Sequence, residues 1–281
     1  MSQIITQHGL KLQIGGPAAI LGRLAAISGN TIREAGRAKL FYGLLGGAIL
    51  LLGFSVVLSD LALVDQKARL VQSFGMAVIP LMCVGTAILL GAVLLHKEID
   101  KKTLYAILPK PVRRSEFIIG KLLGLAALLL AEMAILTLCW WAVLALRGGA
   151  LTAPMLRGMG LQYIELLLIT SVALFFSALS RPVLSGVLTC GVFLAGRVTY
   201  VINDLLSGTK GVFAEVPAMR ALGKLLVAAV PDLGTFSVSD QILQGWDVPW
   251  AYVSAATLYG LSWATVFAVG AVLLFERRDF T

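Results

Sequence analysis

Charged side chains are scarce in this chain. Asp, Glu, Lys and Arg make up only 14% of its 281 residues, whereas the hydrophobic fraction is 58%. A soluble globular domain usually has about a quarter of its residues charged. The composition therefore excludes an ordinary soluble domain and indicates a protein for which lipid is the solvent over much of its surface.

Cysteine and histidine are also rare. The three cysteines, Cys83, Cys139 and Cys190, each lie inside an apolar run without metal or redox spacing, so they are predicted to be small buried residues. His8 and His96 are far apart and form no ligand set. No Ser–Lys pair and no Gly-x-Ser-x-Gly motif are found. We therefore expect no metal site, no catalytic residues and no enzymatic activity.

The sequence has no nucleotide-binding motif. G-x-x-x-x-G-K-[ST] does not occur, because Gly120-Lys121 and Gly223-Lys224 are each followed by Leu and lack the upstream glycine. No cofactor is expected to bind this chain. The net charge of +8 does not indicate nucleic acid, because the basic residues cluster in short stretches between apolar runs.

What the chain has in abundance is long apolar segments. Six of them can span the roughly 30 Å of bilayer hydrocarbon at about 1.5 Å per helical residue. They are residues 40–59, 74–95, 117–146, 162–180, 183–203 and 251–275. The predicted fold is all-α, with a single transmembrane domain over 40–281 that follows an N-terminal segment, 1–39.

The basic residues predict the orientation. With the N-terminus inside, the inner segments and the tail hold 15 Lys and Arg, against 7 in the outer connections. The positive-inside rule then places both termini in the cytoplasm. The first span follows a basic amphipathic segment, 17–39, which is expected to lie along the cytoplasmic interface or, alternatively, to be a solvated lead-in.

The outer connection 204–250 contains an apolar stretch between Pro217 and Pro231. At about a dozen residues it is too short to span. Two interpretations stay open: a re-entrant or interfacial helix at 217–231, or a seventh, tilted crossing that would place the C-terminus outside.

The cytoplasmic connection 96–116 contains a second short helix. Its residues Glu98 to Leu108 place Ile99, Thr103 and Ile107 on one face, and Pro109 ends the helix. Such a helix between two spans is suited to docking on a partner, although resting on lipid is the alternative.

The same segment resembles the cytoplasmic loop of ABC-2 type permeases, the membrane subunits of many ABC exporters. The matching residues are Glu98, Thr103, Leu104, Pro111, Arg114, Ser115, Phe117, Gly120 and Lys121. Residues 30–37 resemble the helix before the first span of this family, and residues 275–280 resemble its closing tail. Both ends and the centre of the chain therefore agree with the family in the same six-span frame.

The resemblance implies a permease subunit of an ABC transporter, expected to be an exporter in the plasma membrane (the inner membrane of a bacterium). ATP would be used by a separate ATPase subunit, and a second copy or a second permease would complete the pathway. The coupling helix would dock on the ATPase through Glu98, Lys101, Lys102, Thr103, Leu104, Ile107, Leu108, Arg113 and Arg114. The alternative is a membrane anchor or scaffold that holds a cytoplasmic machine without moving solute.

Three ionisable residues, Glu132, Glu165 and Arg197, lie inside predicted spans, where a charge needs a partner. Glu165 and Arg197 are each 16 positions from Arg181 in the turn between two spans. They are therefore at matching depth on antiparallel helices, which predicts an ion pair. It could fix the register of the two helices or line a substrate route. In the first span, the glycines 43, 46, 47 and 53 predict close helix packing.

Overall fold

The computed structural model describes residues 17–62, 66–100, 114–207 and 217–277. Every regular element in these ranges is a helix, which confirms the all-α fold. The elements are α1 (Pro17–Gly36), α2 (Lys39–Leu61), α3 (Lys67–Asp100), α5 (Arg114–Leu146), α6 (Ala153–Leu179), α7 (Pro182–Ser207), α9 (Pro217–Ala229), the 3₁₀ turn η2 (Gly234–Phe236), α10 (Ser239–Leu243) and α11 (Trp250–Arg277).

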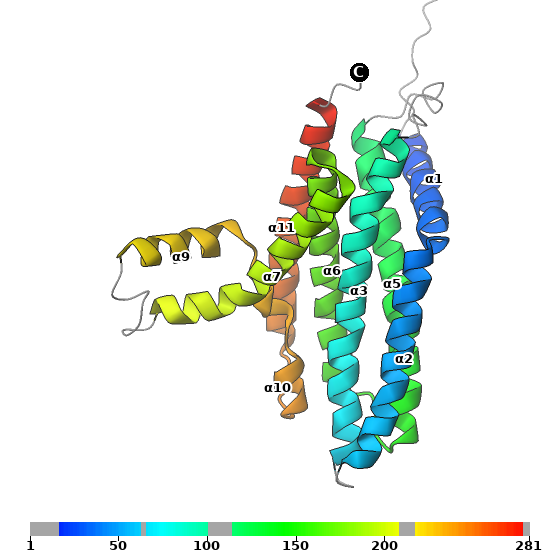
Figure 1. The fold of residues 1–281 in the computed structure, drawn as a ribbon, viewed down its shortest axis with the longest axis vertical. Helices are drawn as coiled ribbons and strands as arrows, with labels where there is room; N and C mark the ends of the chain where they lie inside the picture. The colour runs from blue at the N-terminus through cyan, green and yellow to red at the C-terminus, as the bar shows by residue number, and fades with distance from the viewer. Residues whose placement is uncertain (1–16, 63–65, 101–113, 208–216, 278–281) are drawn as a thin grey trace, which may run out of the picture.

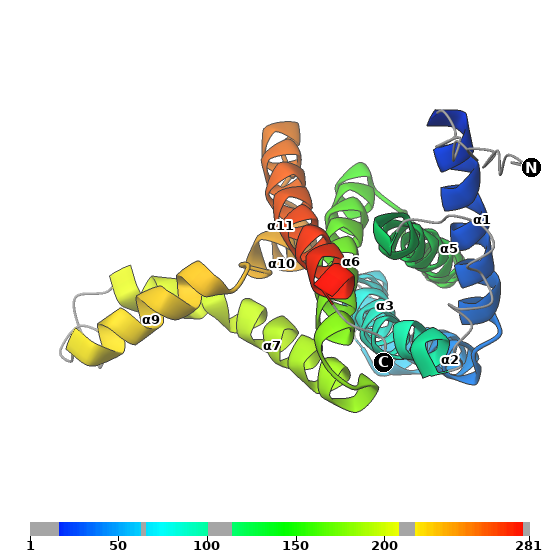
Figure 2. The same ribbon diagram turned by 90° about the horizontal axis from the view of Figure 1, so that it is seen from above.

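Six of these helices are long and apolar enough to cross a membrane: α2, α3, α5, α6, α7 and α11. They correspond one to one to the six predicted spans. Five of them run along the long axis of the molecule, while α7 starts beside α6 and then diverges from the bundle (Figures 1 and 2). The chain is therefore a polytopic membrane protein.

The central helices of the bundle are α3 and α6. In the most apolar stretch of each, 67% of the residues are buried, against 22% in α2, α7 and α11. Trp140 of α5 is fully buried against α3, where its indole Nε1 donates a hydrogen bond to the carbonyl oxygen of Val71 at 2.9 Å. The protein core thus surrounds α3 and α6, and the other spans present much of their surface to lipid.

Local sequence explains where the helices meet. Ala38 has an extended backbone and separates α1 from α2. Gly148 adopts a φ of 71°, the left-handed conformation that favours glycine, just after α5 ends. Ser180 is extended and Pro182 begins α7, so α6 and α7 form the predicted tight hairpin.

Two helices extend further than hydropathy predicts. Helix α3 starts seven residues before the predicted span 74–95 and continues through Asp100, and α6 starts nine residues before residue 162. The extra turns include charged residues, Lys67 and Arg69 in α3 and Arg157 in α6. A helix continues as long as its backbone hydrogen bonds are made, whereas hydropathy detects only the part that contacts hydrocarbon.

Helix α9 lies within the predicted 217–231 segment. It has 13 residues and turns back beside α7, away from the bundle, so it does not run the length of the bundle as a seventh crossing would (Figure 1). Whether it is re-entrant or interfacial stays a prediction.

Two expectations about small residues were wrong. A side chain added at Gly43, Gly46, Gly47 or Gly53 would meet no atom within 4 Å, so no described helix packs closely on these glycines. Cys83 is buried and Cys139 is half-buried, but Cys190 is exposed. Both α2 and α7 lie at the edge of the bundle, where only one face of each helix has neighbours.

Candidate partner-docking end of the bundle

The predicted docking residues are described only in part. Seven of the nine lie in 101–113, outside the described residues. The sequence predicts that Glu98 begins a short helix of its own. In the structure Glu98 instead belongs to the last turn of α3, which continues to Asp100. Arg114 is the first residue of α5. The structure therefore shows how the two flanks of the 101–113 segment are held, and the docking role of the nine residues stays a prediction.

A buried lysine joins these two flanks. Lys121 of α5 is fully buried, and its Nζ donates a hydrogen bond to the carbonyl oxygen of Leu94 on α3 at 3.1 Å. The same ammonium lies 5.4 Å from the ring centre of Phe117. A charged hydrogen bond in a buried place is stronger than one in water. The start of α5 is therefore fastened to the end of α3.

Helix α1 packs on the same part of α5. Arg23 donates two hydrogen bonds to the carboxylate of Glu116, from Nε at 2.8 Å and from Nη2 at 2.9 Å. This bidentate contact raises the pKa of the Arg23 guanidinium above its ordinary value, so the cation persists. One turn further along α5, Ser28 Oγ donates to the carbonyl oxygen of Gly120 at 2.9 Å.

Glycines make this close packing possible. A Cβ at Gly120 would lie 2.7 Å from Ile27, and a Cβ at Gly124 would lie 2.6 Å from Thr31. The basic amphipathic pattern of 17–39 predicts an interfacial helix or a solvated lead-in, but it does not identify α5 as a packing partner. The spacing of four between Gly120 and Gly124 was the available signal, because small residues at that spacing allow two helices to approach.

The start of α5 also contacts the end of α11. Arg114 Nη1 donates to the carbonyl oxygens of Phe275 at 3.3 Å and Glu276 at 3.0 Å. The rings of Phe117 and Phe275 stack at 5.7 Å. A cation at the last carbonyls of a helix is favourable because the helix dipole is negative there. Arg114, predicted as a docking residue, therefore also holds the C-terminal end of α11.

The ion pair predicted inside the membrane is present. Arg197 Nη2 lies 2.9 Å from Glu165 Oε1, and the guanidinium lies 5.4 Å from the ring centre of Phe193. The Glu165 side chain is 1% exposed and that of Arg197 is 30% exposed. The pair joins α6 to α7, as the equal spacing of the two residues from Arg181 predicts.

Glu132 makes a separate contact. It is fully buried and accepts a hydrogen bond from Thr86 Oγ1 of α3 at 2.8 Å. In the described part of the chain, no hydrogen bond joins Glu132 to the Glu165–Arg197 pair. The three predicted intramembrane residues therefore do not form one site. Among the described residues there is also no group of three His, Cys, Asp or Glu that could hold a metal ion.

The opposite end of the bundle carries surface ion pairs and aromatic residues. Arg147 Nη1 lies 2.6 Å from Asp60 Oδ1, and this hydrogen bond raises the pKa of Arg147. Arg157 pairs with Asp247 at 2.7 Å and lies over the ring of Trp250 at 5.0 Å. Exposed tryptophan at the end of a span is typical of the membrane–water interface.

Comparison with known proteins agrees with this architecture. The family model described as ABC-2 family transporter protein matches residues 24–280, which include most of α1 and every later described element through α11. No curated protein sequence matches the chain. Because the match extends over nearly the whole sequence and the structure has the six membrane-crossing helices, the chain belongs to the ABC-2 transporter family.

Proposed function

We propose that this chain is the permease subunit of an ATP-driven exporter, and that a separate ATPase subunit docks on the segment between Asp100 and Arg114. Membership of the ABC-2 family makes the chain a permease subunit of an ABC transporter, which works with an ATP-binding subunit. The docking surface, the direction of transport and the identity of the partner are the proposed part.

The observation that carries the proposal is the way both flanks of this segment are fastened. Lys121 ties the start of α5 to the end of α3, Glu116 ties it to Arg23 of α1, and Arg114 ties it to the last turn of α11. A force applied between residues 100 and 114 would therefore act on four helices together. That is the mechanical requirement for converting closure of an ATPase into motion of the spans.

The proposed contact residues divide by their chemistry. Leu104, Ile107 and Leu108 would fill an apolar cleft of the ATPase, where most binding energy is expected. The charges of Glu98, Lys101, Lys102, Arg113 and Arg114 would steer the encounter and select the partner.

A second permease chain is the other proposed partner. The far half of α7 and helix α9 stand away from the bundle (Figure 2), where α9 packs on α7 and α7 also contacts η2. Its α7 half exposes Val198, Tyr200, Val201 and Leu205. We infer that the arm contributes to the contact with a second copy or a second permease.

Co-purification tests the docking proposal. The tagged chain is co-expressed with a stand-alone ABC ATPase from the same genome, as wild type, as Leu104→Asp/Leu108→Asp and as the matched control Leu104→Ile/Leu108→Ile. At about 2 kcal/mol for each of two central leucines, the Asp variant is expected to lower the affinity about a thousandfold. The Ile variant keeps apolar contact and is expected to retain the complex.

The fold of each variant is checked by its membrane insertion and its thermal unfolding. A complex that survives the Asp substitutions would move docking to another surface. Absence of any complex, with good expression of the wild type, would favour the anchor or scaffold.

A further inference from the structure

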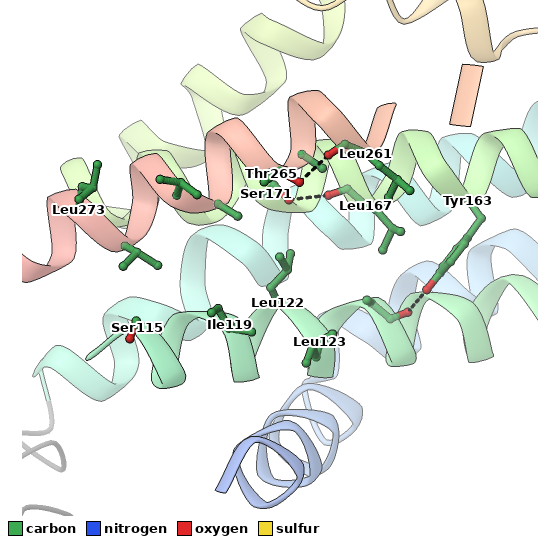
Figure 3. Close-up of a pocket in the computed structure, with 15 residues that line it drawn as sticks. Ser115, Ile119, Leu122, Leu123, Tyr163, Leu167, Ser171, Leu261, Thr265 and Leu273 are labelled. Carbon is green, nitrogen blue, oxygen red and sulfur yellow. Dashed lines mark hydrogen bonds between the residues drawn. The ribbon is translucent and has the colours of Figure 1, made fainter. Parts of the chain in front are cut away.

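A recessed groove runs along one side of the bundle between α5, α6 and α11. Its volume is about 590 Å³, and it is lined by residues 115–126 of α5, 163–171 of α6 and 261–273 of α11. Figure 3 shows α5 and α11 as its two walls, with side chains of α6 between them. Leu123, Leu261 and Leu273 at its rim are exposed, so the groove opens to the surface of the bundle that faces lipid.

The lining is suited to hydrocarbon. Three hydroxyl side chains of the lining donate hydrogen bonds to helix carbonyls: Tyr163 to Ala126 at 3.0 Å, Ser171 to Leu167 at 2.9 Å and Thr265 to Leu261 at 2.7 Å. Their donor protons are therefore used within the protein. The other lining residues are aliphatic apart from Ser115, at the end of the groove. A polar solute would lose its hydration here without gaining matching partners.

The length of the groove fits a lipid chain of one leaflet. From Leu261 to Leu273 the wall of α11 is about 18 Å long at 1.5 Å per residue. One leaflet of a bilayer has about 15 Å of hydrocarbon, half of the 30 Å core.

A cation lies at the end of the groove that is nearest to α1. Arg114 directly precedes Ser115, is exposed, and contacts the last carbonyls of α11, next to the lining residues Val272 and Leu273. An exposed arginine at the end of a span lies at the level of lipid headgroups, where it attracts anionic lipids. The apolar groove and the cation together match the two parts of a phospholipid.

We propose that this groove binds one phospholipid of the leaflet on the α1 side, with an acyl chain between α5 and α11 and its phosphate at Arg114. The inference does not depend on the docking of an ATPase. The bound chain would fill the space between two helices that are joined at one end by Arg114 and by the stacking of Phe117 on Phe275.

The test counts lipids retained by the full chain. The protein is reconstituted in vesicles of equal parts phosphatidylglycerol and phosphatidylcholine, extracted in mild detergent and examined by native mass spectrometry. Ala268→Trp places an indole in the groove, and Val266→Trp is the matched control because Val266 is exposed and lies outside the lining. The wild type and the control are expected to retain one phospholipid, and Ala268→Trp is expected to lose it.

Equal retention in all three proteins, or retention of a free fatty acid in place of a phospholipid, would overturn the proposal. If Ala268→Trp does not fold, Ala126→Phe fills the groove from α5 and is expected to give the same loss. Retention by a folded Ala126→Phe protein would then overturn the proposal.

A separate substitution tests the proposed contact between Arg114 and the lipid phosphate. Arg114→Gln is expected to lower the preference for phosphatidylglycerol over phosphatidylcholine about fivefold, the effect of one basic side chain beside an anionic headgroup. Arg181→Gln is the control, because Arg181 is an exposed cation at the same end of the bundle. An unchanged preference in Arg114→Gln, or an equal loss in both variants, would remove Arg114 from the site.

Discussion

At the scale of single residues, a charged side chain inside a membrane span costs free energy unless it has a partner. Glu165 is almost completely buried, and Arg197 is its ion-pair partner at 2.9 Å. An isolated charge in such a place is costly, so removing one partner leaves the other uncompensated. The pair joins α6 to α7, and its role, fixing the register of the two helices or lining a substrate route, stays a prediction.

A charge swap tests this pair. Arg197→Gln is expected to destabilise the folded protein by about 3 kcal/mol, since it leaves a buried carboxylate unpaired. Glu165→Arg and Arg197→Glu are each expected to lower the amount of folded protein in the membrane, and the double swap is expected to restore it. Arg181→Gln, which removes an exposed charge from the same hairpin, is the control. A double swap no better than the single variants would contradict the pairing.

At the scale of helices, the packing of α1 on α5 is the most specific contact at the docking end. It combines a bidentate ion pair, a hydroxyl–carbonyl bond and two glycines that allow close approach. The carbonyl oxygen of Ser28 would lie only 2.8 Å from a Cβ at Gly124. Because that neighbour is backbone, α1 itself would have to move to accommodate a methyl group.

Alanine substitution of two glycines, one variant each, tests the packing of α1 on α5. Gly124→Ala is expected to destabilise the protein by about 1–3 kcal/mol through overpacking, measured by unfolding in SDS. Gly47→Ala is the matched control, because its Cβ would meet no atom within 4 Å. It is expected to be neutral or stabilising by up to about 1 kcal/mol, since alanine favours helix more than glycine does. Equal effects of the two substitutions would show that α1 is not held as closely as the structure describes.

At the scale of the whole molecule, the two ends of the bundle differ in chemistry. One end has the hairpin turn with Arg181, the start of α5 and the basic helix α1, and the other has the exposed Trp246 and Trp250. The distribution of Lys and Arg favours the α1 end as the cytoplasmic one. We therefore expect both termini in the cytoplasm.

Labelling in cells measures this orientation. In a Cys190→Ala background, Trp246→Cys is expected to react with a membrane-impermeant maleimide in intact cells. Arg181→Cys is expected to react only after permeabilisation. Both parent residues are exposed, so access to the reagent depends on the side of the membrane. The opposite pattern would reverse the topology and place the proposed docking segment outside.

Features that depend on composition along one stretch of chain could be predicted without the structure. The six spans, the hairpin around Arg181 and the pairing of Glu165 with Arg197 all follow from where apolar runs begin and end and from the constant rise of a helix. The cytoplasmic connection 96–116 was identified by its resemblance to the cytoplasmic loop of ABC-2 type permeases. Its docking role stays a prediction.

The contacts between helices, in contrast, became known from the folded bundle. It made α3 and α6 the central helices, placed α1 on Gly120 and Gly124, paired Glu132 with Thr86 and opened a groove between α5, α6 and α11. Hydropathy could not supply these, because lipid and the protein interior are equally apolar. A residue facing either one has the same pattern in the sequence. The choice between them depends on the shapes of helices that are distant in the chain and come together only in the folded bundle.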